Sequence, residues 1–204
     1  MDRDEGKEPT VTDARIRLVV IIGSTRGGRF GPTVADWFVG EARQHADLDV
    51  DVLDLADAAL PDRLEAFGAP TPPEVAAVSS RLAAADAFVV VTPEYNHSYP
   101  APLKTLIDWY GREWQAKPVA FVSYGGMSGG LRAVEHLRPV FAEVHATTVR
   151  DTVSFHGAWA RFGDGGRPLE EAECSAAAKT MLDQLTWWAL ALREARAARP
   201  YVTG

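Results

Sequence analysis

A glycine-rich stretch near the N-terminus, Gly23 to Val34, gathers side chains that donate hydrogen bonds to anions. Its donors are hydroxyl and guanidinium groups, from Ser24, Thr25, Thr33, Arg26 and Arg29. The stretch lies between a buried-strand pattern and a helical pattern, so its backbone N–H groups and the helix dipole would also favour an anion. We therefore predict a phosphate-binding loop; the alternative is a glycine-rich turn whose arginines face solvent. The stretch lacks the motif of a nucleotide P-loop and that of a dinucleotide site.

A second stretch, Pro93 to Tyr99, follows a run of valines and combines polar groups with aromatic rings. Pro93 lacks an N–H group, and we expect the amides after it to leave the sheet ladder. The free N–H and C=O groups of Glu94, Tyr95 and Asn96 would then face a flat heterocycle.

Simpler roles exist for several of these side chains and their neighbours. His97 reads more readily as an exposed loop histidine than as a proton shuttle. Glu94 would serve equally well to cap a helix or to pair with an arginine. Lys104 and Asp108 have the i, i+4 spacing of an exposed ion pair on one helix.

A third stretch, Ser123 to Gly130, holds four glycines, at positions 125, 126, 129 and 130. Glycine lets a backbone approach a ligand closely. The alternative is a flexible loop, and this stretch alone is a weak signal. Taken with the first two, it indicates a site for a phosphorylated flat ring.

The elements that position these stretches alternate along the chain. Strands are expected at residues 16–22, 48–53, 87–91, 118–122 and 144–149, and helices at 33–45, 74–85, 100–110, 131–141 and 168–199, the last as one helix or a pair. Residues 55–73 read as a loop or short turns, and residues 152–167 as irregular. Such alternation predicts a parallel sheet with helices on both faces. The three stretches each follow a buried strand, so they should converge at the carboxyl ends of the strands.

Composition limits the classes of function. The net charge is −7 and the basic residues are scattered, which gives no support to nucleic-acid binding. Cys174 is the one cysteine, so no disulfide or cysteine-based metal site is expected within the chain. The polar start is unlike a signal peptide, and no apolar run approaches the ~20 residues of a membrane span. We expect a cytoplasmic protein with a disordered tail at residues 1–14 and a single domain at residues 15–199.

Taken together and in this order, the three motifs resemble those of the NADPH-dependent FMN reductase family of flavodoxin-like proteins. This family includes flavin, quinone, azo-dye and chromate reductases. The likeness runs from about Ile16 to Arg196. Its most specific part is Pro93-Glu94-Tyr95-Asn96-His97-Ser98, followed by Leu103-Lys104 and Asp108-Trp109. The first loop departs from the family, because many relatives carry Ser and Asn where this chain has Arg29-Phe30-Gly31-Pro32-Thr33.

The resemblance implies an α/β flavodoxin-like fold, a five-stranded parallel sheet in the order 2-1-3-4-5 with helices on both faces. It also implies FMN across the strand ends, with the phosphate on the first loop and the isoalloxazine ring against the other two. The cofactor-binding residues would be Ser24, Arg26, Arg29, Phe30, Gly31, Thr33 and Val34, with Pro93, Glu94, Tyr95, Asn96, Ser123, Tyr124, Gly125 and Gly126.

For activity, the resemblance implies hydride transfer from NADPH (or NADH) to FMN, with no catalytic side chain and no metal, because the flavin carries the chemistry. Backbone amides of Tyr95, Asn96, Gly125 and Gly126 would stabilise the reduced ring. If NADPH and the acceptor use the same face of the flavin in turn, the kinetics would be ping-pong, with a flavin, quinone, azo compound or oxidised metal ion as acceptor. A monooxygenase partner could also use the reduced flavin. Homodimers or homotetramers are usual in the family.

Two rival classes of protein stay open at this point. One is a non-enzymatic FMN-binding electron carrier or redox sensor, although a flavodoxin phosphate loop lacks this pair of arginines. The other is a scaffold that has lost its flavin, which the intact loops argue against. The role of Trp159 is open too: it is expected in core or subunit contacts, or over a neighbouring subunit's flavin.

Overall fold

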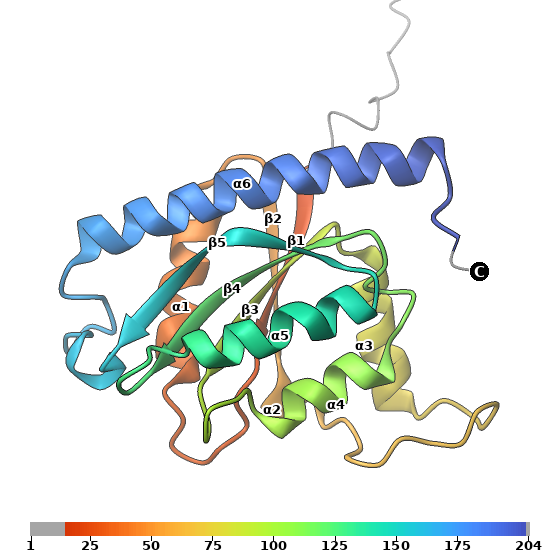
Figure 1. The fold of residues 1–204 in the computed structure, drawn as a ribbon, viewed down its shortest axis with the longest axis horizontal. Helices are drawn as coiled ribbons and strands as arrows, with labels where there is room; N and C mark the ends of the chain where they lie inside the picture. The colour runs from red at the N-terminus through yellow and green to blue at the C-terminus, as the bar shows by residue number, and fades with distance from the viewer. Residues whose placement is uncertain (1–14, 203–204) are drawn as a thin grey trace, which may run out of the picture.

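A computed structural model of the chain describes residues 15–202 and contains one five-stranded parallel sheet (Figure 1). The strands are β1 (Ile16–Ile22), β2 (Leu48–Asp54), β3 (Ala87–Pro93), β4 (Pro118–Gly125) and β5 (Thr147–His156). Their order in the sheet is β2-β1-β3-β4-β5, and every neighbouring pair is parallel. The predicted flavodoxin-like order is therefore confirmed. The N-terminal stretch for which a tail was predicted lies outside the described residues.

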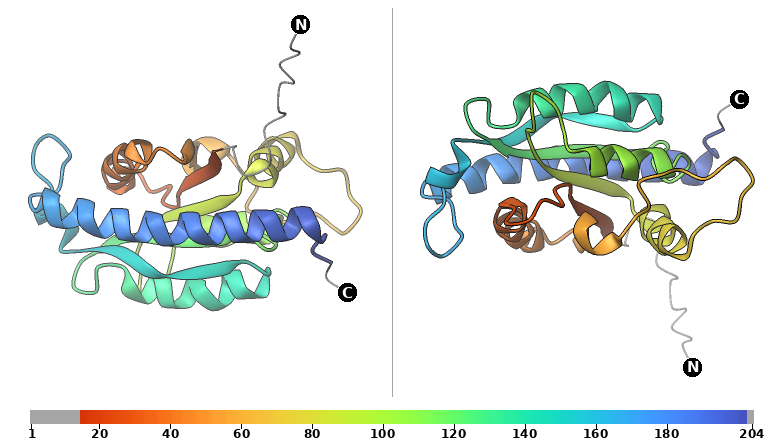
Figure 2. Two further views of the ribbon diagram at one scale, coloured as in Figure 1. Left: turned by 90° about the horizontal axis from the view of Figure 1, so that it is seen from above. Right: turned by 90° about the horizontal axis from the view of Figure 1, so that it is seen from below.

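Helices cover both faces of the sheet (Figure 2). On one face, α1 (Gly31–Gln44) and α6 (Glu171–Ala198) pack with the sheet around one apolar cluster. On the other face, α3 (Pro73–Ala84), α4 (Ala101–Trp109) and α5 (Leu131–Glu143) share a second cluster. The short helix α2 (Leu55–Ala58) follows β2 directly. The central strand β3 is buried along its whole length, as its apolar sequence predicts.

The last strand differs from the prediction in both of its bounds. It was expected at residues 144–149, but β5 begins at Thr147 and continues to His156, inside the segment expected to be irregular. The reason is a shift in register, since Val119 pairs with Thr148 whereas Phe121 pairs with Thr152. The extra residues form an irregularity that interrupts the alternation of apolar residues without ending the strand.

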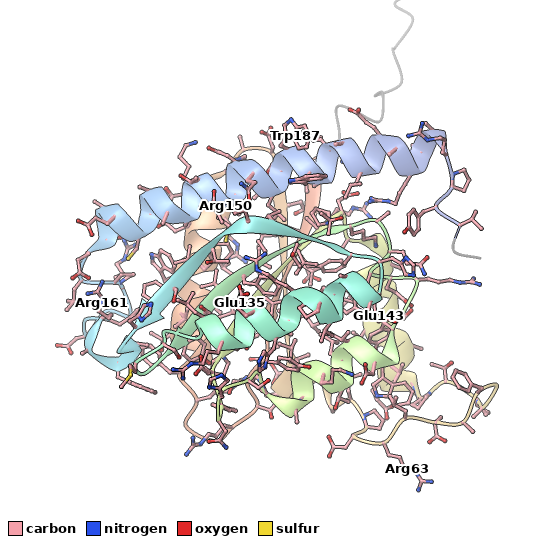
Figure 3. All side chains as sticks on the ribbon, viewed as in Figure 1. Arg63, Glu135, Glu143, Arg150, Arg161 and Trp187 are labelled. Atoms are coloured by element: carbon pink, nitrogen blue, oxygen red, sulfur yellow. The ribbon has the colours of Figure 1, made fainter. Side chains whose placement is uncertain are left out.

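The C-terminal helix is a single helix of 28 residues, so the alternative of a helix pair is wrong. It buries Met181 and Leu185, whereas Trp188 is 36% exposed and Trp187 is 63% exposed. Figure 3 shows Trp187 on the side of α6 away from the sheet. Within residues 15–202, no helix combines the length and the apolar character needed to cross a bilayer.

Candidate functional site

The three predicted loops meet at the carboxyl ends of the central strands, and hydrogen bonds connect their bases. The N–H group of Gly23 donates to the carbonyl of Val91 at 2.9 Å, which joins the ends of β1 and β3. The N–H group of Glu94 donates to the carbonyl of Tyr124 at 3.2 Å, which joins the ends of β3 and β4. The convergence expected from the fold is therefore present.

The first loop presents unpaired donors at its outer side. Arg26 and Thr25 are exposed, and no side-chain partner for Arg26 occurs among residues 15–202. Helix α1 begins at Gly31 with no side-chain cap at Phe30 and no acidic residue in its first turn. An uncapped helix N-terminus beside a free guanidinium is well suited to an anion.

Arg29 has a different environment from Arg26, although the two were predicted to share one role. Its guanidinium donates to both carboxylate oxygens of Asp54, at 2.5 and 2.7 Å, and to the carbonyl of Ser24 at 2.7 Å. Asp54 also accepts from the N–H group of Ala56 and so caps α2. Arg29 therefore stabilises the conformation of the first loop by connecting it to the end of β2.

Tyr124 packs under the first loop. A side-chain carbon on Gly31 would lie 2.9 Å from its hydroxyl group, so only glycine fits at that position. The ring makes an edge contact with Phe30 at 6.2 Å between centroids. Its hydroxyl is buried and has no hydrogen-bond partner among the described residues. Burial, together with the nearby Tyr95 hydroxyl, raises the pKa of Tyr124 above its ordinary value.

The neighbouring hydroxyl groups show how the first two loops are held together. Ser24 is fully buried, and its hydroxyl shares a hydrogen bond of 2.7 Å with the hydroxyl of Tyr95. Thr33 and Val34 lie in the first turn of α1; Val34 is buried and Thr33 is partly exposed. Of the predicted phosphate ligands, Ser24 thus uses its hydroxyl on Tyr95, whereas Arg26 and the backbone at the start of α1 stay accessible.

The second loop is a tight turn. Tyr95 and Ser98 exchange backbone hydrogen bonds of 2.8 and 3.0 Å, and Asn96 and His97 between them both have positive φ angles, 48° and 74°. This is the geometry of a two-residue turn that normally favours Gly or Asn. The N–H groups of Glu94 and Tyr95 were both predicted to be free, but that of Glu94 donates to the carbonyl of Tyr124 and that of Tyr95 is used inside the turn. That of Asn96 has no acceptor in the described part of the chain.

Glu94 takes the simpler of its two predicted roles. Its side chain is 8% exposed and accepts hydrogen bonds from the Ser128 hydroxyl at 2.5 Å and from the backbone and guanidinium of Arg132 at 3.2 and 3.0 Å. Burial opposes ionisation, but these hydrogen bonds outweigh it and lower the pKa of Glu94. The carboxylate thus clamps the second loop to the third loop and to the start of α5.

The third loop is ordered by its own contacts. The carbonyl of Gly129 accepts from the hydroxyl groups of Ser123 and Ser154, both at 2.8 Å. Gly130 has a φ angle of 86°, and a side-chain carbon there would lie 2.7 Å from the Cβ of Ser123. Gly125 is buried, whereas Gly126 is exposed and its N–H group has no acceptor within residues 15–202. The alternative of a flexible loop is not what the structure shows.

Sequence reasoning missed the residues that support these loops from a distance. They are Asp54 under the first loop, Arg132 beside the second, and His156 under the third, where its ring carbon lies 2.6 Å from the ideal Cβ position of Gly129. Asp54 ends a strand and precedes a helix, which is a recognisable capping position. Nothing local to Arg132 or His156 indicates a partner in another loop.

Comparisons with known proteins identify the family. The family model described as NADPH-dependent FMN reductase matches residues 16–160, more than half of the chain. The chain therefore belongs to the NADPH-dependent FMN reductase family.

Individual relatives agree with this assignment. An NAD(P)H-dependent FMN reductase of Schizosaccharomyces pombe is 40% identical over 121 residues, which are 56% of this chain and 60% of the relative. An FMN-dependent NADPH-azoreductase of Staphylococcus haemolyticus is 30% identical over 179 residues, which are 82% of this chain and 92% of the relative. The NAD(P)H:acceptor oxidoreductase FerB of Paracoccus denitrificans shares the fold, with a TM-score of 0.70, 22% identity, and coverage of 86% of this chain and 98% of FerB.

The site's own chemistry fits the cofactor that the family name implies. A phosphate needs donors without competing carboxylates, and Arg26 with the uncapped start of α1 provides them. A flat ring with polar edges needs exposed backbone donors, and Asn96 and Gly126 provide them. Tyr124 adds a buried hydroxyl that still lacks a partner. The residues present therefore suit FMN.

Proposed function

We propose that this protein is an FMN-dependent NAD(P)H oxidoreductase that reduces a small-molecule acceptor such as a flavin, a quinone or an azo compound. The observation that carries the proposal is the first loop, which combines the unpaired Arg26 with the uncapped N-terminus of α1. When bound, FMN supplies the redox chemistry, by accepting hydride from the nicotinamide and passing electrons to the acceptor.

The residues of this chain bind and orient. Arg26 and the first-turn amides of α1 would hold the phosphate, and the Arg29–Asp54 pair connects that loop to the end of β2. The N–H groups of Asn96 and Gly126 would donate to the polar edge of the ring and so would stabilise negative charge there. No side chain is assigned as an acid or base.

The first experiment is an absorption spectrum of the purified protein, followed by anaerobic addition of NADPH. The expected result is a flavin spectrum that bleaches. A bound flavin that stays oxidised would favour an electron carrier or sensor. A protein that takes up no FMN would refute the assignment of the three loops.

Steady-state kinetics test whether the nicotinamide and the acceptor bind, one after the other, to the same face of the flavin ring. Varying NADPH against menadione should give parallel double-reciprocal lines, as expected for a ping-pong reaction. Intersecting lines would show that both substrates bind together and would contradict a shared face.

The proposed form of the protein is a homodimer or homotetramer. Its support is the pair Trp187 and Trp188 on α6, which are 63% and 36% exposed and whose ring centroids lie 5.2 Å apart, because exposed apolar patches often mark protein interfaces. Analytical ultracentrifugation measures the mass directly, and a monomer at micromolar concentration would contradict this part of the proposal.

A further inference from the structure

A cavity of about 540 Å³ lies at the opposite edge of the sheet from the candidate cofactor site. Lys117, which lines it, immediately precedes the first residue of β4, whereas the third loop follows the last residue of the same strand. The other walls come from the end of α3, the segment before β4, α6 and the C-terminal residues. In Figure 1 the C-terminal tail lies at the opposite side of the molecule from the arrowhead of β5.

Lys117 forms the base of this cavity and is 5% exposed. Its ammonium group donates to the carbonyls of Leu82 and Ala83, at 2.8 and 2.9 Å. An ammonium group has three N–H donors, so these two carbonyls leave one unused, and the group also lies 5.6 Å from the centroid of the Phe88 ring. Burial and the nearby Arg196 lower the pKa of Lys117 to about 8, against the opposing effect of Asp86 and Glu113.

Arg196 lies beside Lys117 and lines the same cavity. Its guanidinium donates to the carbonyl of Ala116 at 2.5 Å and lies 3.4 Å from the carboxylate of Asp86. Asp86 is shared with Arg193, whose guanidinium lies 3.6 Å away. One carboxylate therefore faces two guanidinium groups behind the wall of the cavity.

The rim adds a third arginine and one further carboxylate. Arg112 is exposed and has no charged partner among the described residues, whereas Glu113 accepts a hydrogen bond from the Ser79 hydroxyl at 2.6 Å. Among the described residues that line the cavity, the cations are Arg112, Lys117 and Arg196; the carboxylate that lines it is Glu113, and Asp86 lies behind it against Arg196. The cations exceed the carboxylates, so the cavity is suited to an anion.

The size and the remaining wall indicate an organic ligand rather than a single oxyanion. The volume falls in the range of small-molecule sites, about 300–1,000 Å³. Tyr201 supplies an aromatic wall, and its hydroxyl is held by the ring nitrogen of His145 at 3.0 Å. A ligand that fills the space while meeting several cations must carry more than one anionic group.

We propose that this cavity binds a small organic polyanion, with Arg112, Lys117 and Arg196 as its cationic contacts. The site is separate from the candidate cofactor site and uses none of its residues, so the proposal does not depend on the proposed function.

Citrate is the probe, and inorganic phosphate at matched ionic strength is the comparison. Thermal unfolding of the FMN-saturated protein should shift upward with citrate, as mass action requires of a ligand that binds the folded state. Arg112→Gln should raise the apparent dissociation constant for citrate about tenfold or more, the loss expected for one charged hydrogen bond, and Arg112→Glu should raise it further. Arg150→Gln is the control, since Arg150 is 90% exposed on β5 (Figure 3) and should bind citrate like the wild type.

Three results would overturn the proposal. Citrate that stabilises Arg112→Gln as strongly as the wild type would place the anion elsewhere. A citrate effect that disappears in Arg26→Ala would place it in the phosphate loop. Equal stabilisation by phosphate and citrate would show a site for a lone oxyanion and refute the organic ligand.

Discussion

Arg26 and Arg29 are separated by two residues in sequence, but their contacts show that they have different roles. Arg29 is engaged by Asp54 and the carbonyl of Ser24, whereas Arg26 is exposed and unpaired within the described chain. A guanidinium already committed to a carboxylate has few donors left for a phosphate. The proposal for FMN binding therefore rests on Arg26, with Arg29 as a positioning residue.

Arg26→Ala should weaken FMN binding by roughly 1.5–3 kcal/mol, because it removes a charged hydrogen bond to the phosphate. Fluorescence titration of the apoprotein with FMN measures this directly. Arg43→Ala is the control, since Arg43 is exposed in the last turn of α1, at the other end of the helix. Equal affinities for wild type and Arg26→Ala would move the phosphate away from this loop.

The Arg29–Asp54 pair should contribute to folding. Each of Arg29→Gln and Asp54→Asn should lower the free energy of unfolding by about 1–3 kcal/mol, because each leaves the other group partly buried without its partner. The double variant should lose less than the sum of the two single variants. Urea denaturation of the wild-type, single-variant and double-variant apoproteins measures the four free energies of unfolding. If the losses of the two single variants add up to the loss of the double variant, the two side chains do not interact.

Tyr124 and Tyr110 form a matched pair of buried phenols. Both are at most 4% exposed, but the hydroxyl of Tyr110 donates to the carbonyl of Val75 at 2.9 Å, whereas that of Tyr124 has no partner among the described residues. Tyr110→Phe should therefore destabilise the apoprotein by about 1 kcal/mol. Tyr124→Phe should leave its stability unchanged or raise it, and should weaken FMN binding if the hydroxyl serves the cofactor. A larger loss of stability for Tyr124→Phe would contradict this contrast.

At the scale of elements, the segment between β5 and α6 is attached to two of the cofactor loops. At its start, the N–H group of Gly157 donates to the carbonyl of Gly126 at 2.8 Å. Further on, the ring of Phe162 contacts that of Phe30 at 5.3 Å between centroids. Trp159 lies between these two contacts and is 65% exposed. The segment therefore borders the site where the acceptor would bind.

Trp159→Ala should lower kcat/KM for menadione about twofold to tenfold, as expected for the loss of one aromatic contact, and should leave ferricyanide reduction within about twofold. Phe67→Ala is the control, because Phe67 is fully exposed in the segment between α2 and α3 and has no role in the proposed site or subunit contact. Sedimentation of both variants shows whether either residue holds subunits together. An equal fall with both acceptors would indicate an effect on the flavin instead, and a change of mass in Trp159→Ala would indicate a subunit contact.

At the scale of the whole molecule, Lys117 gives stability an unusual dependence on pH. Its pKa is lowered from 10.5 to about 8 in the folded protein, by burial and by Arg196. Between these values the unfolded chain binds more protons than the folded chain, so the free energy of unfolding should rise with pH. Tyr110 and Tyr124 act in the opposite direction above their ordinary pKa of 10, because burial raises the pKa of each phenol.

The expected profile is a rise in stability that begins near pH 8 and ends near pH 10. Urea unfolding at several pH values across this window measures it. Lys117→Met should remove the rise, although it also removes the hydrogen bonds to Leu82 and Ala83. A profile that stays flat in the wild type would show that Lys117 titrates at its ordinary pKa.

Much of this architecture could be predicted because the signals are local. The all-apolar run of β3 and the glycines that follow β1 and β4 are readable without a structure, and they place the three loops at one edge. The end of β5 was predicted wrongly because the change of register around residues 149–151 breaks its pattern. The partners of Arg29 and Glu94 lie 25 and 38 residues away, and such pairs depend on packing that no spacing reveals.

The position of α6 in the chain has a consequence for how the protein is made. All five strands are complete at His156, but the face of the sheet that α1 and α6 share is fully covered only when α6 has formed as far as Ala189. A ribosome that has just finished β5 therefore carries a nascent chain with a bare apolar surface. We expect this half-built form to be the stage at which chaperones bind most tightly, and substitutions at Met181 or Leu185 to reduce yield in cells more than they reduce the activity of the purified protein.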